Sequence, residues 1–189
     1  MKKQLLLLYF LLITVALIAQ NHMEFRGVPI TGHRDSFVSE MKKLGYSETY
    51  RNETGIVMEG KFTNKDAELL ILSSAKSKTV WKVAAQIDQD ESWSKLKRDY
   101  FYYVELYTSK YGQPSDHFEY FLSPYYEGDG FELQALRNEK CTYSTFFITD
   151  SGFIGVKITN SGKLSLEYED RINSDQDSKE KESSVLDDI

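Results

Sequence analysis

Apolar and polar positions divide the chain into a leader, a long stretch of helix and strand patterns, and a polar end. In the leader, Lys2 and Lys3 precede the apolar residues 5–18 and the small residue Ala19. A basic start, an apolar core of about 7–15 residues and a small residue behind it are typical of a secretory signal peptide. The run is shorter than the roughly 20 apolar residues of a membrane span. We therefore expect residues 1–20 to be a cleaved signal peptide.

Apolar residues that recur at steps of three and four predict two helices. The first covers residues 35–44 and stops at Gly45. The second begins after Asp90 or Ser92, ends at Gly112 and carries an unusually broad aromatic face. Because a stripe of this width needs to be covered, we expect the second helix to pack against a sheet.

Alternating apolar and polar residues predict antiparallel strands, because every second side chain of a strand points to the same face. Residues 112–130, where prolines and glycines interrupt the pattern, are expected to be irregular. The sequence thus predicts an α+β fold, in which two helix-then-antiparallel-strands units form a sheet with the helices on one face. The predicted strands cover residues 56–63, 67–74, 79–88, 131–138, 140–149, 153–160 and 163–169.

Length and composition favour one domain behind the leader. A domain commonly has about 100–200 residues, so residues 21–170 are interpreted as a single α+β domain. Residues 24–88 and 90–169 share the order of helix and strands, and we interpret them as two degenerate repeats. Residues 171–189 contain no aromatic side chain and are dense in charge and serine. They are expected to form a flexible polar tail, with a short helix at residues 185–189.

The charge balance argues against a nucleic-acid partner. The chain has a formal net charge of −6, which becomes more negative when Lys2 and Lys3 leave with the signal peptide. Nucleic-acid binding needs a basic face, and the sequence shows no cluster of lysine or arginine. We therefore expect no nucleic acid among the partners.

Cys141 is the only cysteine in the sequence, which limits both disulfides and membrane anchors. No disulfide can form within the chain, and no cysteine follows the leader as a site for lipid attachment. We therefore expect a soluble periplasmic or secreted protein that has no transmembrane segment after signal cleavage. Cys141 itself is interpreted as a small buried hydrophobe, with a reactive thiol as the alternative.

Neither a catalytic motif nor a metal-binding motif is recognisable. His22, His33 and His117 lie far apart, and none has the spacing of a zinc site. No nucleophile motif such as G-x-S-x-G occurs. The sequence therefore predicts no catalytic residue, no metal and no cofactor.

Carboxylates leave one enzymatic alternative open. A glycosidase places two carboxylates on either side of a sugar, and a sequence does not reveal that spacing. The alternative function is therefore a small exported hydrolase that acts on glycans. Its paired carboxylates would come from Asp88, Asp90, Glu127 or Asp129.

Aromatic residues gather in the irregular segment, among them Tyr125, Tyr126 and Phe131. On an exposed loop they would form a contact patch for a protein or another envelope component, whereas under the sheet they would seal its core. The first interpretation predicts a non-enzymatic binding module of the cell envelope that contacts its partner through these three residues. A further alternative is a structural envelope protein whose tail is the interaction element.

Several stretches of the chain together carry a resemblance to a known family. They are His22 to Gly32, Phe37, Met41, Gly45, Trp93, Lys110 to Ser115, Tyr168 to Asn173 and Asp187 to Ile189. In these stretches the chain resembles a family of small exported proteins from Bacteroides-type bacteria, which implies export and no particular activity. The helix-then-strands order also resembles the fold of β-lactamase inhibitor proteins and of small outer-membrane assembly factors. That resemblance implies a binding module, by analogy of fold alone.

Overall fold

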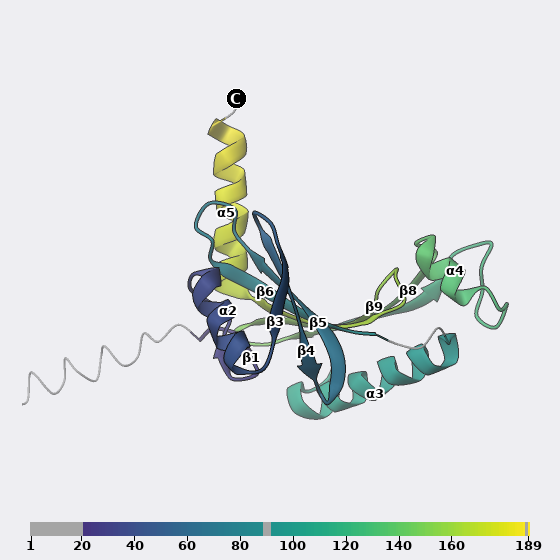
Figure 1. Cartoon of the computed structure of the whole chain (residues 1–189). Coiled ribbons are helices and arrows are strands. Elements are labelled where there is room, and N and C mark those ends of the chain that lie inside the picture. Colours follow the sequence, from purple (N-terminus) through teal and green to yellow (C-terminus); the bar gives the residue numbers. More distant parts are fainter. Residues whose placement is uncertain (1–20, 89–91, 188) are drawn as a thin grey trace, which may run out of the picture.

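The computed structural model describes residues 21–88, 92–187 and 189 (Figure 1). The predicted signal peptide, residues 1–20, and Asp90 lie outside the described residues. The helices are α2 (Arg34–Lys43), α3 (Trp93–Tyr111), α4 (Glu132–Arg137) and α5 (Arg171–Asp187). The strands are β1 (Glu24–Phe25), β2 (Val28–Pro29), β3 (Ser47–Arg51), β4 (Gly55–Phe62), β5 (Lys65–Ser73), β6 (Val80–Ile87), β7 (Asp116–Phe121), β8 (Cys141–Ile148), β9 (Gly152–Ile158) and β10 (Leu164–Asp170). Within the described residues, no helix has the length and apolar character needed to cross a bilayer.

In the described part of the chain, eight strands form one antiparallel sheet in the order β3-β4-β5-β6-β10-β9-β8-β7, and β1 pairs with β2 in a small hairpin. Each half of the chain contributes four neighbouring strands, and the halves meet where β10 pairs with β6. At this junction Leu166 lies opposite Ala85. The predicted α+β fold, with helices followed by antiparallel strands, is confirmed.

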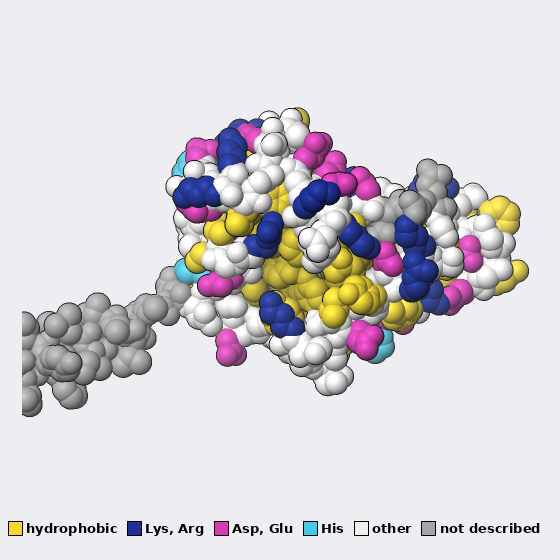
Figure 2. All heavy atoms as spheres, turned by 60° about the horizontal axis from the view of Figure 1, so that its bottom comes forward, with side chains coloured by type: hydrophobic (Ala, Val, Ile, Leu, Met, Phe, Trp, Pro, Cys, Tyr) yellow, Lys and Arg dark blue, Asp and Glu magenta, His cyan; other side chains and the backbone are white. Residues whose placement is uncertain are grey.

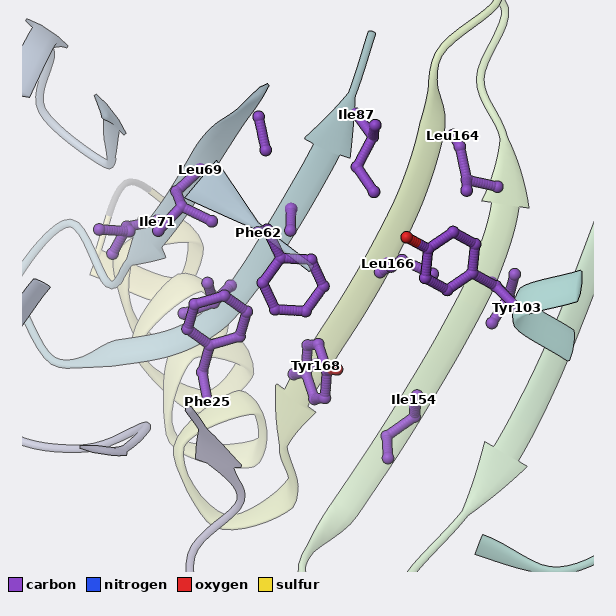
Figure 3. Close-up of a cluster of buried hydrophobic side chains, with 14 of the residues drawn as sticks. Phe25, Phe62, Leu69, Ile71, Ile87, Tyr103, Ile154, Leu164, Leu166 and Tyr168 are labelled. Atoms are coloured by element: carbon purple, nitrogen blue, oxygen red, sulfur yellow. The ribbon is translucent and has the colours of Figure 1, made fainter. Parts of the chain in front are cut away.

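One face of the sheet forms the hydrophobic core. Facing residues of antiparallel strands point to the same side, so Leu69, Ala85 and Leu166 form a row across β5, β6 and β10. All three side chains are buried. Figure 3 shows other members of this cluster, including Phe25 of β1, whose ring stacks on that of Phe62 at a centroid distance of 5.3 Å. Burial of this apolar surface supplies the main driving force for folding.

Helix α3 covers this face and inserts tyrosine rings into the core. The hydroxyl of Tyr100 shares a hydrogen bond with Thr145 Oγ1 at 2.6 Å, and that of Tyr103 with Thr63 Oγ1 at 2.5 Å. These bonds allow large rings to be buried without leaving an unpaired polar atom. Helix α2 contributes to the same cluster through Phe37, Val38 and Met41. The two predicted helices therefore share one core with the sheet.

Three segments differ from the predicted pattern. Residues 116–121, expected to be irregular, form strand β7, and residues 132–137, predicted to be part of a strand, form helix α4. The neighbours Ala135 and Leu136 are both buried, which a helix permits and a half-exposed strand does not. Residues 47–51, for which no strand is predicted, form β3, which is largely exposed and lacks the alternation of a half-buried strand. Strand β7 does alternate, but its pattern is short and lies within a segment that prolines and glycines interrupt.

The polar end of the chain also differs from expectation. Residues 171–189, expected to be a flexible tail with a helix only at 185–189, instead form α5 over Arg171–Asp187. Helix α5 has no continuous apolar stripe, and buried polar contacts hold its first turn. Asn173 Nδ2 donates to the backbone oxygens of Ile30 at 2.8 Å and Val80 at 3.1 Å. These partners are distant in sequence, so local composition does not reveal that the segment is ordered.

Candidate binding surface

The segment between β7 and α4, residues 122–131, lies at the end of the molecule opposite α2 and α5 (Figure 1). It carries the three residues that the sequence singles out as a contact patch. Tyr126 is 66% exposed and Phe131 is 58% exposed. Tyr125 instead packs half-buried against the core, and its hydroxyl accepts a hydrogen bond from Asn138 Nδ2 at 2.8 Å. The structure thus separates two outward-facing rings from one that supports the loop.

Carboxylates fix the backbone beneath the exposed rings. Asp129 accepts the N–H of Tyr126 at 3.1 Å and the N–H of Phe131 at 2.7 Å. Glu132 Oε1 accepts the N–H of Gly128 at 2.9 Å. Side chains that accept nearby backbone N–H groups replace the hydrogen bonds that regular structure would provide. The loop therefore presents Tyr126 and Phe131 from a defined backbone.

An aromatic cluster supports the loop from below. The Trp93 ring meets Phe121 and Tyr143 edge-on, with centroid distances of 5.7 Å and 5.1 Å. Tyr143 is in turn 5.6 Å from the ring of Tyr100. Edge-to-face contacts of this kind are favourable beyond the area they bury. They join the start of α3 to strands β7 and β8, on which the loop rests.

Beside the loop lies a hollow of about 440 Å³. Lys97 of α3 spans it and forms an ion pair with Glu127 of the loop, and the Lys97 Nζ lies 5.8 Å from the centre of the Phe101 ring. Tyr143 donates a hydrogen bond to Glu127 Oε2 at 3.4 Å. These contacts hold the loop against α3. The hollow is lined by Trp93, Ser94, Lys97, Arg98, Phe101, Glu127, Gly128 and Glu132.

Cys141 lies beneath the same loop and is buried. Its burial, together with the nearby negative charges of Glu127 and Glu132, raises the pKa of the thiol to about 12. Since the thiolate is the reactive form of cysteine, the side chain is unreactive at neutral pH. Burial favours the first of the two interpretations, a small hydrophobe.

The carboxylates considered for glycan hydrolysis have other partners. Glu127 is paired with Lys97, and both oxygens of Asp129 accept backbone N–H groups of the loop. Asp88 forms an ion pair with Lys163 at 3.1 Å. Asp90 lies outside the described residues.

The three histidines have separate surroundings in the structure. His22 Nδ1 lies 3.0 Å from Asp170 Oδ2, and His33 caps α2 by accepting the N–H of Asp35 at 3.3 Å. His117 is exposed on β7. Over residues 21–88 and 92–187, no group of three or more His, Cys, Asp or Glu side chains is arranged to hold a metal ion.

Helix α3 exposes a second group of apolar side chains. Figure 2, which brings the α3 side of the molecule forward, shows an apolar area bordered by lysine and arginine. Phe101, Tyr102 and Leu106 of α3 are exposed. They continue the aromatic stripe that the helical spacing predicts, and the sheet covers only part of that stripe. These three side chains lie on one helix, whereas the loop extends from the end of the sheet.

A third apolar area, which sequence reasoning missed, lies on the face of the sheet opposite the core. Ile148 of β8 faces Phe153 of β9, and Phe118 of β7 lies beside Phe146, with ring centroids 6.2 Å apart. Lys157 Nζ is 5.2 Å from the centre of the Phe146 ring. The sequence did indicate this area, because the outward positions of β8 and β9 carry apolar residues. A sheet with one face in water has polar residues at such positions.

Comparison with known proteins adds no relative to this description. No family model matches the chain, and no curated protein or solved structure matches it at a significant level.

Proposed function

We propose that this chain is an exported, non-enzymatic binding module of the cell envelope that holds a protein partner through residues 122–131. The observation that carries the proposal is the combination of two strongly exposed rings, Tyr126 and Phe131, with a backbone that Asp129 fixes. Rings on a prearranged backbone lose little conformational freedom on binding, so more of their apolar burial becomes affinity. Tyrosine and other large aromatic residues commonly dominate the energetics of protein interfaces.

The setting of the rings favours a protein over a small molecule. Pockets for small molecules enclose most of the ligand in a concave, largely apolar cavity. Tyr126 and Phe131 instead stand outward at one end of the molecule, and each is followed in the chain by a charged residue, Glu127 and Glu132. An apolar centre with a polar rim is the common arrangement of protein interfaces. We therefore expect a partner with an apolar pocket that receives these rings.

Export is proposed from the sequence, and a non-enzymatic role is proposed because the candidate catalytic carboxylates are bound to other groups of the protein. The basic and apolar leader supports export. The partners of Glu127, Asp129 and Asp88 support a binding role over hydrolysis, because a catalytic carboxylate must reach the substrate.

A cross-linking pull-down from envelope extract tests the binding site. The double variant Tyr126→Ser/Phe131→Ser is compared with the unchanged protein and with Tyr102→Ser, which removes a comparably exposed ring from α3. We expect the captured partner to fall about tenfold or more in the double variant, since loss of interface anchors commonly has this effect. The Tyr102→Ser control should capture as much as the unchanged protein.

Two results would contradict the proposal. Equal capture by the unchanged protein and the double variant would remove the loop from the interface. Recovery of the protein in the cytoplasm with its leader intact would contradict the proposed location in the cell envelope.

A further inference from the structure

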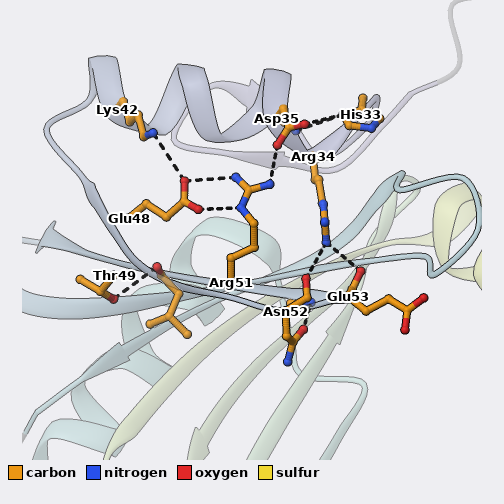
Figure 4. A network of polar contacts seen from close by, with 11 residues as sticks. His33, Arg34, Asp35, Lys42, Glu48, Thr49, Arg51, Asn52 and Glu53 are labelled. Atoms are coloured by element: carbon orange, nitrogen blue, oxygen red, sulfur yellow. Dashed lines mark hydrogen bonds and ion pairs between the residues drawn. The ribbon is translucent and has the colours of Figure 1, made fainter.

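The two edges of the eight-stranded sheet differ in how they are protected. The β3 edge has five residues, and its pairing with β4 is interrupted by a bulge between Glu48 and Tyr50. Arg51 of β3 bridges Glu48 and Asp35, the latter from α2, as Figure 4 shows. Short length, a bulge and charged side chains are the features by which proteins prevent sheets from joining edge to edge.

The β7 edge has six residues and two charged side chains, Asp116 and Glu119, but it lacks a bulge. It pairs with β8 without interruption from Asp116 opposite Phe146 to Phe121 opposite Cys141. It contains no lysine and no proline. Phe118 is 41% exposed, and Tyr120, on the same face, is 44% exposed. A regular, aromatic and uncovered edge strand is a surface for adding a further strand.

The outer side of β7 presents backbone groups for such a strand. Leu122 donates its N–H to Lys140 O at 2.7 Å. Since hydrogen-bonded pairs alternate along antiparallel strands, the even-numbered residues of β7 exchange bonds with β8. The odd-numbered residues His117, Glu119 and Phe121 therefore direct their N–H and C=O groups outward. In the single chain the His117 N–H donates to Asp116 Oδ1 at 2.8 Å, a local contact that a bond to an added strand would replace.

We propose that β7 pairs with β7 of a second copy of this chain, antiparallel and about a twofold axis through Phe118. The two sheets then become one continuous sheet. Residues that face each other across antiparallel strands lie on the same side of the sheet, so this axis places His117 opposite Glu119 of the second copy, twice. On the other face it places Asp116 opposite Tyr120, also twice, where the hydroxyl can donate to the carboxylate.

Charge complementarity favours the axis at Phe118 over an axis at Glu119. An axis moved by one residue to Glu119 would place two glutamates directly opposite each other, which destabilises a strand pair. The axis at Phe118 avoids that contact and pairs each Glu119 with an imidazole. A second copy is therefore a better occupant than an arbitrary extended peptide, because the strand sequence is complementary to itself.

The apolar area on the sheet face opposite the core supports the same arrangement. Phe118, Phe146, Ile148 and Phe153 form that area, and Phe118 lies on the edge strand itself. With the twofold axis at Phe118, the areas of the two copies join across the new strand pair. Apolar surface exposed in one copy becomes partly buried, which favours association.

Single cysteines in β7 test the register. Phe118→Cys places two thiols opposite each other on the axis, within the Cβ separation of facing residues, and mild oxidation should link two chains through a disulfide. Tyr120→Cys is the matched control, because it lies on the same strand and face but opposite Asp116. We expect a covalent dimer on a non-reducing gel for the first variant and at least about tenfold less for the second. Equal cross-linking of the two variants, or none in either, would overturn the proposal.

A charge exchange tests the pairing without oxidation. The unchanged protein should have the mass of a dimer by light scattering, His117→Glu should associate about tenfold more weakly, and His117→Glu/Glu119→Lys should recover dimerisation. Circular dichroism confirms that each variant is folded. The proposal would be overturned if the unchanged protein is a monomer, including one that binds only a foreign peptide at β7. It would also be overturned if the double variant dimerises no more strongly than the single variant. The outcome is independent of Tyr126 and Phe131, so it can fail while the proposed function stands.

Discussion

Asp170, the last residue of β10, accepts the backbone N–H of Asn173 at 2.9 Å where the strand passes directly into α5. The same buried carboxylate accepts the N–H of Met23 at 2.8 Å and lies 3.0 Å from His22 Nδ1. One side chain thus connects the start of the described chain, the last strand and the last helix. The polar end of the protein is ordered from this point.

Replacing Asp170 by alanine should destabilise the protein strongly. The change leaves the N–H groups of Met23 and Asn173 without an acceptor in a buried site, and each unsatisfied group costs about 1–3 kcal/mol. We expect the free energy of unfolding, measured with a denaturant, to fall by about 2–4 kcal/mol. Asp175→Ala, which removes an exposed carboxylate from the first turns of α5, is the control and should change the free energy of unfolding by less than about 0.5 kcal/mol. Equal losses in the two variants would argue against the role of Asp170.

Glu167 should make the stability of the fold sensitive to acid. Burial raises the pKa of its carboxyl, but Lys82 at 2.8 Å and Lys157 at 3.0 Å outweigh burial and hold the pKa below 4.5. A lowered folded-state pKa contributes stability above the unfolded pKa, and this contribution is lost as the pH falls through the folded value. The free energy of unfolding should therefore decrease below about pH 4.5, and Glu167→Gln should make this decrease shallower.

Denaturant unfolding from neutral pH down to about pH 3 measures this effect. Glu59→Gln, an exposed glutamate on β4, serves as the control and should leave the acid slope unchanged. If Glu167→Gln keeps the slope of the unchanged protein, the ion pairs of Glu167 are not its source.

Cys141 should react with thiol reagents only after unfolding. Burial and two nearby glutamates raise its pKa to about 12, against 9.0 for an unperturbed thiol. At a mildly alkaline pH the thiolate fraction is therefore about 1000-fold smaller in the folded protein, and burial slows access further. A colorimetric thiol assay with and without denaturant measures both rates. Rapid labelling of the folded protein would show that Cys141 is accessible.

Gly152 should not tolerate a side chain. A Cβ at this position would lie 1.9 Å from the backbone oxygen of Glu169 in the neighbouring strand, so β9 and β10 would have to move apart. We expect Gly152→Ala to lower the free energy of unfolding by more than about 2 kcal/mol. Gly162→Ala is the matched control, because its Cβ meets open space and only its positive φ of 80° is strained. That variant should lose about 1 kcal/mol. A similar loss of unfolding free energy in the two variants would mean that β9 and β10 can move apart at Gly152 at little cost.

The candidate site was only partly predictable. The sequence places Tyr125, Tyr126 and Phe131 together in one aromatic segment, but their exposure depends on which ring the fold supports. Tyr125 finds Asn138 as a hydrogen-bond partner and turns inward, whereas Tyr126 stays outside. The hollow beside the loop joins Trp93 and Glu127, which are distant in sequence, so no spacing rule could have brought them together.

Local pattern alone determined the elements that bury one regular face. Helix α3 follows from its aromatic residues at steps of three and four, and strands such as β9 follow from alternation, because one buried face imposes its period on the sequence. Tertiary structure alone decided the rest. Strand β7 exists through its pairing with β8, and α5 is held in place by Asp170, Ile30 and Val80. In both, the stabilising groups come from other parts of the chain, so the residues within the element carry no long apolar pattern from which it could be predicted.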